Sequence, residues 1–173
     1  MLATSQMIAL STLLLLMAYV AIIDIKFMII PNPVNAAIFL TGMAASFALP
    51  VVDPLSALCA SVLGGGFLVL IQAAFRAYRG YDGLGWGDVK FVAAAATWIG
   101  LEGIPLMLLI ASVSALVYVG ARQMLDRGFN MHHRVPFGPF LALGATSIAG
   151  LQILSRRSMA DIMEIWMLAP LFG

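Results

Sequence analysis

Two aspartates lie at the ends of apolar stretches in a chain that otherwise contains little charge. Asp24 closes the first such stretch, and Asp88 belongs to the hexapeptide Gly-Trp-Gly-Asp-Val-Lys at 85–90, at the entrance to another. A carboxylate at such a position carries a solvation penalty, and membrane proteins keep such groups where they have a function. Two of them suggest a pair that works as general acid and general base.

The chemistry of such a pair follows from charge repulsion. Two neighbouring carboxylates do not readily both ionise, so they share one proton near neutral pH. The ionised member then activates a water molecule and the protonated member protonates a leaving group, as in aspartic proteases. Each residue alone has a simpler interpretation: Asp88 as a helix N-cap, and Asp24 as a helix-end residue that meets interfacial water. Lys26 and Lys90 are then snorkelling anchors.

The composition indicates a helical membrane protein. Of the 173 residues, 62% are hydrophobic and 10% are charged, whereas soluble domains carry about 25% charged residues. A helix across the hydrocarbon core needs about 20 residues. Five charge-free runs come near or exceed that length, and the apolar segment 88–101 is a shorter sixth. The five runs are 1–23, 29–52, 54–75, 103–121 and 135–155. We predict an all-α protein with six transmembrane helices and a single domain over residues 1–173.

Local signals predict where two helices begin and where one packs closely. Asn32 before Pro33, and Asp53 before Pro54, each predict an N-cap followed by a proline at the first helical position. Three consecutive glycines at 64–66 predict a close approach to a neighbouring helix.

The basic residues predict the orientation. With six crossings, seven of the nine lie on one side, which the positive-inside rule makes the cytoplasm. These seven are Lys26, Arg76, Arg79, Lys90, Arg122, Arg127 and Arg134. The other two, Arg156 and Arg157, precede a segment at 158–168 that we expect to lie in the interface. Asp24 follows the first crossing and Asp88 the third, so both face the cytoplasmic boundary and can meet. The first run lacks a basic leader region, so we expect a retained helix.

Three motifs in a fixed order resemble the type IV prepilin leader peptidase family. They are Ile23-Asp24 with Ile30-Pro31-Asn32, the hexapeptide at 85–90, and Val-Pro-Phe-Gly-Pro-Phe at 135–140. The resemblance covers nearly the whole chain. It implies a multi-pass aspartic endopeptidase of the bacterial inner membrane, with Asp24 and Asp88 as the catalytic aspartates. It also implies that prepilin or pseudopilin leaders are cut at the cytoplasmic face. We expect no partner beyond these substrates and the lipid bilayer, and no nucleic acid.

The resemblance also marks motif and support positions around the pair. They are Pro31, Asn32, Gly85, Gly87, Lys90, Pro136, Gly138 and Pro139. Asn32 occupies a position often held by Asp in the longer family members, so this chain has no third acid there. Lys26 and Arg134, together with Lys90, are candidate contacts for an acidic residue near the cut site, or simply topology charges.

The longer family members carry an amino-terminal insert with paired Cys-x-x-Cys motifs. This chain begins directly with the peptidase core, so it resembles the short form of tight-adherence pilus systems and of compact type IV pilus or secretion systems. We therefore expect cleavage without methylation of the new amino terminus, and no cofactor. We also expect no metal. The lone Cys59, expected as a small buried side chain, cannot build a cysteine zinc site, and His132-His133 are expected at a loop surface.

Two other functions stay open at this point. A presenilin-type intramembrane protease shares the Gly-x-Gly-Asp motif, but the proline-rich third motif and the compact core favour the prepilin class. A proton-coupled transporter could use Asp24 and Asp88 as a relay. Transporters often contain internal repeats, and the two halves of this sequence do not resemble each other.

Overall fold

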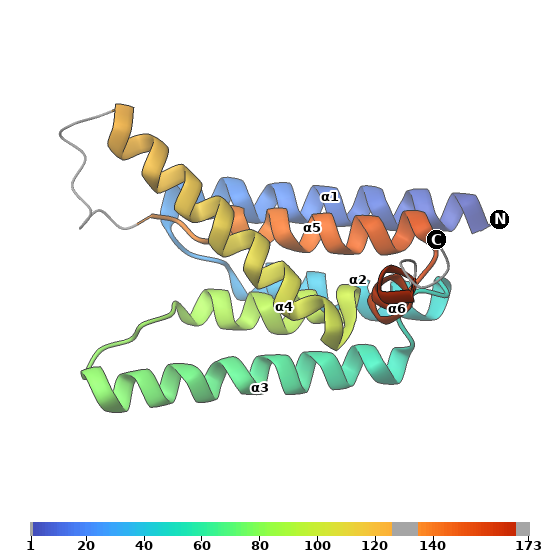
Figure 1. Cartoon of the computed structure of the whole chain (residues 1–173), viewed down its shortest axis with the longest axis horizontal. Coiled ribbons are helices and arrows are strands. Elements are labelled where there is room, and N and C mark those ends of the chain that lie inside the picture. The colour runs from blue at the N-terminus through green and yellow to red at the C-terminus, as the bar shows by residue number, and fades with distance from the viewer. Residues whose placement is uncertain (1, 126–134, 169–173) are drawn as a thin grey trace.

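A computed structural model of the chain describes residues 2–125 and 135–168, and within these ranges all regular structure is helical. The six helices are α1 (Leu2–Phe27), α2 (Asn32–Ala48), α3 (Pro54–Arg79), α4 (Trp86–Leu125), α5 (Gly138–Ser155) and α6 (Met159–Leu168). The all-α prediction is thereby confirmed. In Figure 1, α1, α3 and α5 lie nearly along one direction, whereas α6 is seen end-on and crosses it.

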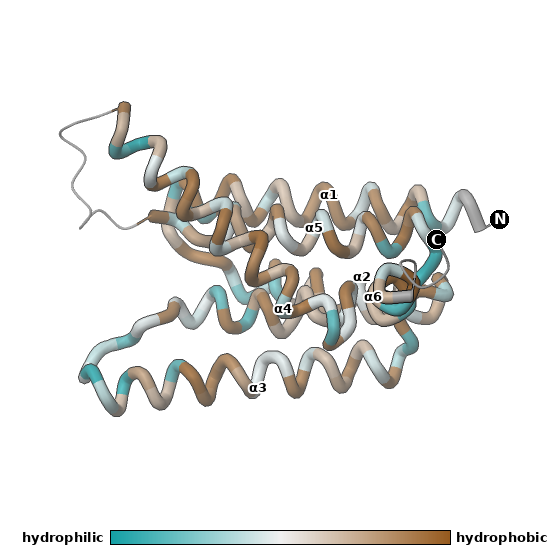
Figure 2. The backbone as a smooth tube through the Cα atoms, in the orientation of Figure 1, coloured by the Kyte–Doolittle hydropathy of each residue, from teal (hydrophilic) through white to brown (hydrophobic). Residues whose placement is uncertain are grey.

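Four of the described helices are long and apolar enough to cross a membrane, which makes this a multi-pass membrane protein. These spans are Thr4–Phe27, Pro54–Arg79, Trp86–Leu125 and Gly138–Ser155. The count differs from the predicted six for two reasons. Helix α2 has 17 residues, about 26 Å at 1.5 Å per residue, against a core about 30 Å thick. The predicted segments 88–101 and 103–121 form one element, α4. Hydrophilic residues gather toward the ends of the long helices (Figure 2).

Helix α4 changes direction at Gly100. This residue has φ 71° and ψ 176°, values outside the helical region inside an otherwise helical element. A positive φ is available to glycine at little cost because glycine has no Cβ. The first part of α4 runs beside α3, and the second part turns back toward the end of the bundle where α4 began (Figure 1). The two parts therefore form a bent pair, although they are continuous in sequence.

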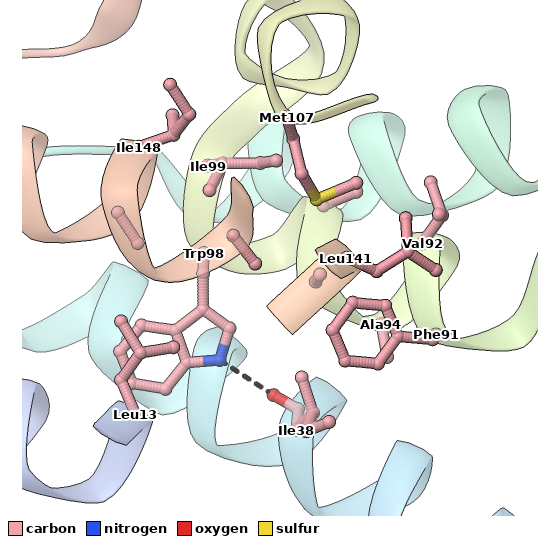
Figure 3. Packing of buried hydrophobic residues seen from close by; sticks show 14 of the residues in the cluster. Leu13, Ile38, Phe91, Val92, Ala94, Trp98, Ile99, Met107, Leu141 and Ile148 are labelled. Atoms are coloured by element: carbon pink, nitrogen blue, oxygen red, sulfur yellow. Dashed lines mark hydrogen bonds between the residues drawn. The ribbon is translucent and has the colours of Figure 1, made fainter. Parts of the chain in front are cut away.

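The core is built around the first part of α4. Helix α4 packs against α2, α3 and α5, and α1 packs against α5. Phe91, Val92 and Ile99 of α4 are buried together with Leu141 of α5 (Figure 3). The indole Nε1 of Trp98 donates a hydrogen bond of 2.9 Å to the carbonyl of Ile38 in α2. This bond satisfies the one polar atom of a buried indole and fixes α4 against α2.

Two of the three consecutive glycines allow α3 to approach α4. A Cβ at Gly65 would lie 2.7 Å from the Cβ of Ala93, and one at Gly64 would collide with the side chain of Ile104. The predicted close approach is confirmed for these two positions, whereas Gly66 faces open space. Cys59 is exposed on α3. The expectation that it is buried is wrong, because it lies on the side of α3 that faces away from the bundle.

One of the two predicted N-caps is confirmed. The Oδ2 of Asp53 accepts a hydrogen bond of 3.0 Å from the backbone N–H of Ser56 at the start of α3. The prediction for Asn32 is wrong. Pro31 occupies the cap position of α2 and its carbonyl accepts the first backbone bonds of the helix, while Asn32 is already helical. The Asn32 side chain is therefore free to bond elsewhere.

Candidate active site

Asp24 and Asp88 line one cavity at one end of the bundle, as the helix directions predicted. Helix α1 ends there, and α2, α4 and α5 begin there (Figure 1). The cavity has a volume of about 950 Å³. Its walls come from three separate stretches of chain: 24–32, 82–90 and 135–137. These stretches contain residues of all three motifs of the sequence, which are thus brought to one place.

Asp24 is held by the start of α5. Its side chain is 5% exposed, and its Oδ2 accepts a hydrogen bond of 2.7 Å from the backbone N–H of Gly138. Gly138 is the first residue of α5. The first N–H groups of a helix have no partner within the helix and attract negative charge. The third motif therefore contributes a backbone donor that holds the first carboxylate.

Gly138 also leaves the space that Asp24 occupies. A Cβ at position 138 would lie 2.7 Å from Oδ2 and 2.9 Å from both Cβ and Cγ of Asp24. Carbon atoms in contact are normally about 3.5–4.0 Å apart. Any side chain at this position would therefore displace the carboxylate. Pro139 follows in the first turn of α5, where a proline costs no hydrogen bond.

Asp88 is the third residue of α4 and is partly buried. Its carboxylate lies close to Gly85, whose carbonyl accepts a hydrogen bond of 3.2 Å from the backbone N–H of Val89. A Cβ at Gly85 would lie 3.0 Å from the Oδ2 of Asp88. Each carboxylate therefore lies against a glycine that leaves it room, and Gly138 also donates a backbone hydrogen bond to its carboxylate.

Helix α4 begins two residues earlier than predicted. Trp86 and Gly87 are helical, so only Gly85 of the Gly-x-Gly pair precedes the helix. A Cβ at Gly87 would lie 3.4 Å from the backbone nitrogen of Ile30. The predicted helix start at Asp88 is thus wrong. Gly87 lets the connection between α1 and α2 pass close to α4.

Lys90 and Asn32 form part of the cavity wall and bind each other. The Nζ of Lys90 donates a hydrogen bond of 3.0 Å to the Oδ1 of Asn32, and both residues line the cavity. This bond explains why the Asn32 side chain does not cap its own helix. It joins α2 to α4 across 58 positions of sequence and places one ammonium group in the same cavity as the two carboxylates.

The structure brings together most of the positions that the sequence singled out. Those that line the cavity are Asp24, Asn32, Gly85, Gly87, Asp88, Lys90 and Pro136. Gly138 reaches it through its bond to Asp24, and Pro31 lies between two residues of its wall. Lys26 is exposed at the end of α1 and does not line the cavity. Arg134 and His132-His133 lie outside the described residues.

Sequence reasoning missed Gln72. This side chain of α3 is 1% exposed, and its Oε1 accepts a hydrogen bond of 2.8 Å from the backbone N–H of Leu84. Leu84 lies directly before Gly85, so the bond ties the loop that precedes Asp88 to α3. Gln72 is the only polar side chain in the sequence between Ser61 and Arg76. An isolated amide in such an apolar stretch was the available signal.

We expect Gln72→Leu to weaken both the fold and the site. The substitution leaves the N–H of Leu84 without its acceptor, which costs about 1–3 kcal/mol of unfolding free energy, and it frees the loop before Asp88. The turnover number kcat should fall by a larger factor than KM rises. Thr97→Val is the matched control, because Thr97 is equally buried and its hydroxyl donates a hydrogen bond to the carbonyl of Ala94 in its own helix. Equal losses of turnover in the two variants, at equal stability, would contradict a positioning role for Gln72.

Metal ligands do not gather in the described part of the chain. No group of three or more His, Cys, Asp or Glu side chains occurs there in an arrangement that could hold a metal ion. The metal-independent reaction stays a prediction. What the cavity does hold is two carboxylates, one ammonium group and backbone donors. This set suits proton transfer to and from water and a bound peptide.

The fold and the site define a multi-pass helical membrane protein that keeps two carboxylates in one cavity at an end of the bundle. The pattern of the type IV leader peptidase family matches residues 11–120. The chain therefore belongs to the type IV leader peptidase family, as the three motifs predicted.

Individual relatives agree with this assignment. The chain is 30% identical over 125 residues to a prepilin leader peptidase/N-methyltransferase of Escherichia coli K12, covering 72% of this chain and 55% of the relative. It is 31% identical over 140 residues to the protein of that name from Aeromonas hydrophila, covering 78% and 47%. The chain spans about half the length of the curated relatives it matches. No solved structure matches it significantly.

Proposed function

We propose that this protein is an aspartic endopeptidase that removes the leader peptide of prepilin-like proteins, with Asp24 and Asp88 as its catalytic residues. One observation carries the proposal: two carboxylates 64 positions apart in sequence line the same cavity, and each lies directly against a motif glycine. The names of the relatives, which combine a leader peptidase with an N-methyltransferase, support the first of these activities for the matched region.

The reaction follows from the groups in the cavity. One carboxylate takes a proton from a water molecule as that water attacks the carbonyl carbon of the scissile peptide bond. The other carboxylate donates its proton to the carbonyl oxygen, which gives a neutral tetrahedral intermediate. When the intermediate collapses, the C–N bond breaks, and the carboxyl group that took the water proton donates it to the leaving nitrogen. The other carboxylate takes back its proton from the hydroxyl group derived from the carbonyl oxygen, so the pair returns to its starting state. The products are a carboxylic acid on the leader and a free amino terminus on the mature protein.

Charges beside the cavity suit an acidic substrate segment. The ammonium group of Lys90 lies in the cavity wall, and Lys26 is exposed in the last turn of α1 at the same end of the bundle. We propose that these lysines, together with Arg134, attract an acidic residue near the cut site. The remaining support positions, Pro31, Pro136 and Pro139, fix the backbone where the first and third motifs approach the cavity.

We also propose a six-crossing topology for a single domain in the cytoplasmic membrane. Helices α1, α2 and α3, the two parts of α4, and α5 supply the crossings. Both aspartates then lie at the end that carries Lys26, Arg76, Arg79 and Arg122, which the positive-inside rule makes cytoplasmic. A transporter is disfavoured, because both carboxylates lie at one end and not along a path between the two ends.

The topology predicts which introduced cysteines a membrane-impermeant thiol reagent can reach. In a Cys59→Ala background, Arg79→Cys at the end of α3 should stay unlabelled in intact cells and become labelled after permeabilisation. Glu102→Cys, just beyond the bend of α4, should label in intact cells. Both positions are in the described structure and Glu102 is exposed. Labelling of Arg79→Cys but not Glu102→Cys would invert the topology and place the cavity on the wrong side for the proposed substrate.

Cleavage of a candidate prepilin tests the function itself. A prepilin and this protein are co-expressed, and the size and amino terminus of the product are determined by mass spectrometry. The proposal expects cleavage on the cytoplasmic side of the substrate's hydrophobic segment. Intact substrate in the presence of inserted, folded enzyme, for every candidate from the same genome, would contradict it.

A further inference from the structure

A second cavity lies at the end of the bundle opposite Asp24 and Asp88. It has a volume of about 810 Å³, within the range of sites that bind small molecules. The connection between α2 and α3 forms one wall, and the bend of α4 at Gly100 and the start of α6 form others. The proposed cleavage reaction makes no use of this cavity.

One residue that lines this cavity carries a buried hydrogen-bond acceptor that lacks a donor. Gln152 of α5 lines the cavity, and its side chain is 1% exposed. Its Nε2 donates a hydrogen bond of 3.1 Å to the carbonyl of Ile99, which fixes the orientation of the amide. Its Oε1 has no hydrogen-bond partner among the described residues. A buried acceptor without a donor is unfavourable, so the site suits a ligand that brings an N–H group to this point.

The charge of the lining defines the ligand further. Asp53 and Glu102 line the cavity and are exposed, and the described residues that line it include no Lys, Arg or His. One oxygen of Asp53 caps α3, but its charge and that of Glu102 remain at the wall. Buried apolar side chains such as Val52 and Met159 supply much of the rest. A hard metal cation would need six or more oxygen ligands. An organic ammonium group, which brings both N–H donors and positive charge, fits this lining better.

The surroundings of the cavity point to a lipid as the source of the ammonium group. Helix α6 crosses the direction of the long helices (Figure 1) and exposes apolar side chains, with Trp166 80% exposed. Tryptophan is enriched where membrane proteins meet lipid head groups. Arg157 is exposed and lies directly before Ser158, which lines the cavity. An exposed arginine next to a lining residue can bind a phosphate group.

We propose that this cavity binds the head group of an aminophospholipid. The primary ammonium group lies against the Oε1 of Gln152 and near the carboxylates of Asp53 and Glu102, and the lipid phosphate lies near Arg157. The site is independent of the proposed cleavage, because it lies at the other end of the bundle and shares no lining residue with the first cavity.

Native mass spectrometry of the full chain, released from nanodiscs, tests this proposal. The nanodiscs contain equal amounts of phosphatidylethanolamine and phosphatidylcholine with matched acyl chains. Both head groups carry one positive charge on nitrogen, but only ethanolamine has N–H groups. Retained phosphatidylethanolamine should exceed phosphatidylcholine by about tenfold, a difference of about 1.4 kcal/mol. Gln152→Leu should abolish this preference, whereas Gln72→Leu, which changes the other fully buried glutamine, should preserve it.

A second variant tests the proposal in case Gln152→Leu does not fold. Glu102→Gln changes an exposed residue and removes one charge from the wall, so it should reduce the retained phosphatidylethanolamine severalfold. Equal retention of the two lipids by the wild-type protein would overturn the proposal, as would full preference in both variants. Displacement of the bound lipid by soluble phosphoethanolamine at millimolar concentration would contradict the proposal that the ammonium group in the cavity comes from a lipid. None of these measurements depends on cleavage, so failure here and failure of the proposed peptidase activity are told apart.

Discussion

Asp24→Asn and Asp88→Asn should each reduce leader cleavage by a factor of about 10²–10⁴, the contribution of a positioned acid or base. Asparagine keeps the size and shape of the side chain, but its amide neither takes the proton from water nor holds the shared proton. Ala should be at least as damaging. The measurement is a single-turnover rate on a purified prepilin, with equal amounts of each variant reconstituted in lipid.

Asn32→Asp is an informative companion to these variants. It places a carboxylate at the position where longer family members often carry one, in the same cavity, without touching either catalytic residue. If it restores cleavage to Asp24→Asn or Asp88→Asn, the reaction needs two carboxylates in the cavity but does not need them at these two positions. Robust cleavage by either Asn variant alone, with the protein inserted and folded, would also remove the pair from the mechanism.

Gly138→Ala should reduce cleavage by about 10²-fold, the loss that a displacement of about 1 Å causes at a reacting group. The added Cβ would lie 2.7 Å from the Oδ2 of Asp24, so the carboxylate must move out of its bond to the backbone of α5. Substrate binding should change less than the rate, because the cavity walls at Asn32 and Lys90 are untouched. The check is kcat and KM measured separately on the same prepilin.

Gly150→Ala is the matched control, because it lies in the same helix and an added Cβ there meets nothing within 4 Å. It should keep the wild-type rate and add slightly to stability, since alanine favours a helix more than glycine does. A Gly138→Ala enzyme as active as Gly150→Ala would mean that Asp24 tolerates displacement. Cleavage would then not require the hydrogen bond by which Gly138 of the third motif holds Asp24.

The sequence predicted the all-helical class and the placement of both aspartates in one cavity, because apolar length indicates helices and the order of the apolar runs brings the end of α1 and the start of α4 to the same side. It did not predict what holds each carboxylate. The bond from Gly138 to Asp24 joins residues 114 positions apart. Glycine has no side chain that could indicate a hydrogen-bond donor, and its donor here is the backbone N–H. The same holds for Leu84, whose backbone N–H is the partner of Gln72.

One wrong prediction and one feature that was not predicted have local causes. Asn32 has the residue type and the following proline of an N-cap, but Lys90 offers its side chain a charged donor from another helix. A helix of the predicted kind was correct over 88–101 and over 103–121, yet the bend between them depends on one backbone conformation at Gly100. Glycine permits this conformation without requiring it, so the residue type alone does not fix the geometry.

The bond between Gly138 and Asp24 also sets the order in which the site is completed during synthesis. Asp24 leaves the ribosome 114 residues before its partner, a delay of roughly 6–23 s at about 5–20 residues per second. Through that interval α1 to α4 can already be in the bilayer while the carboxylate lacks its donor. Helix α5, which is made after α1 to α4, therefore converts an inserted but immature bundle into one whose first aspartate is held in place.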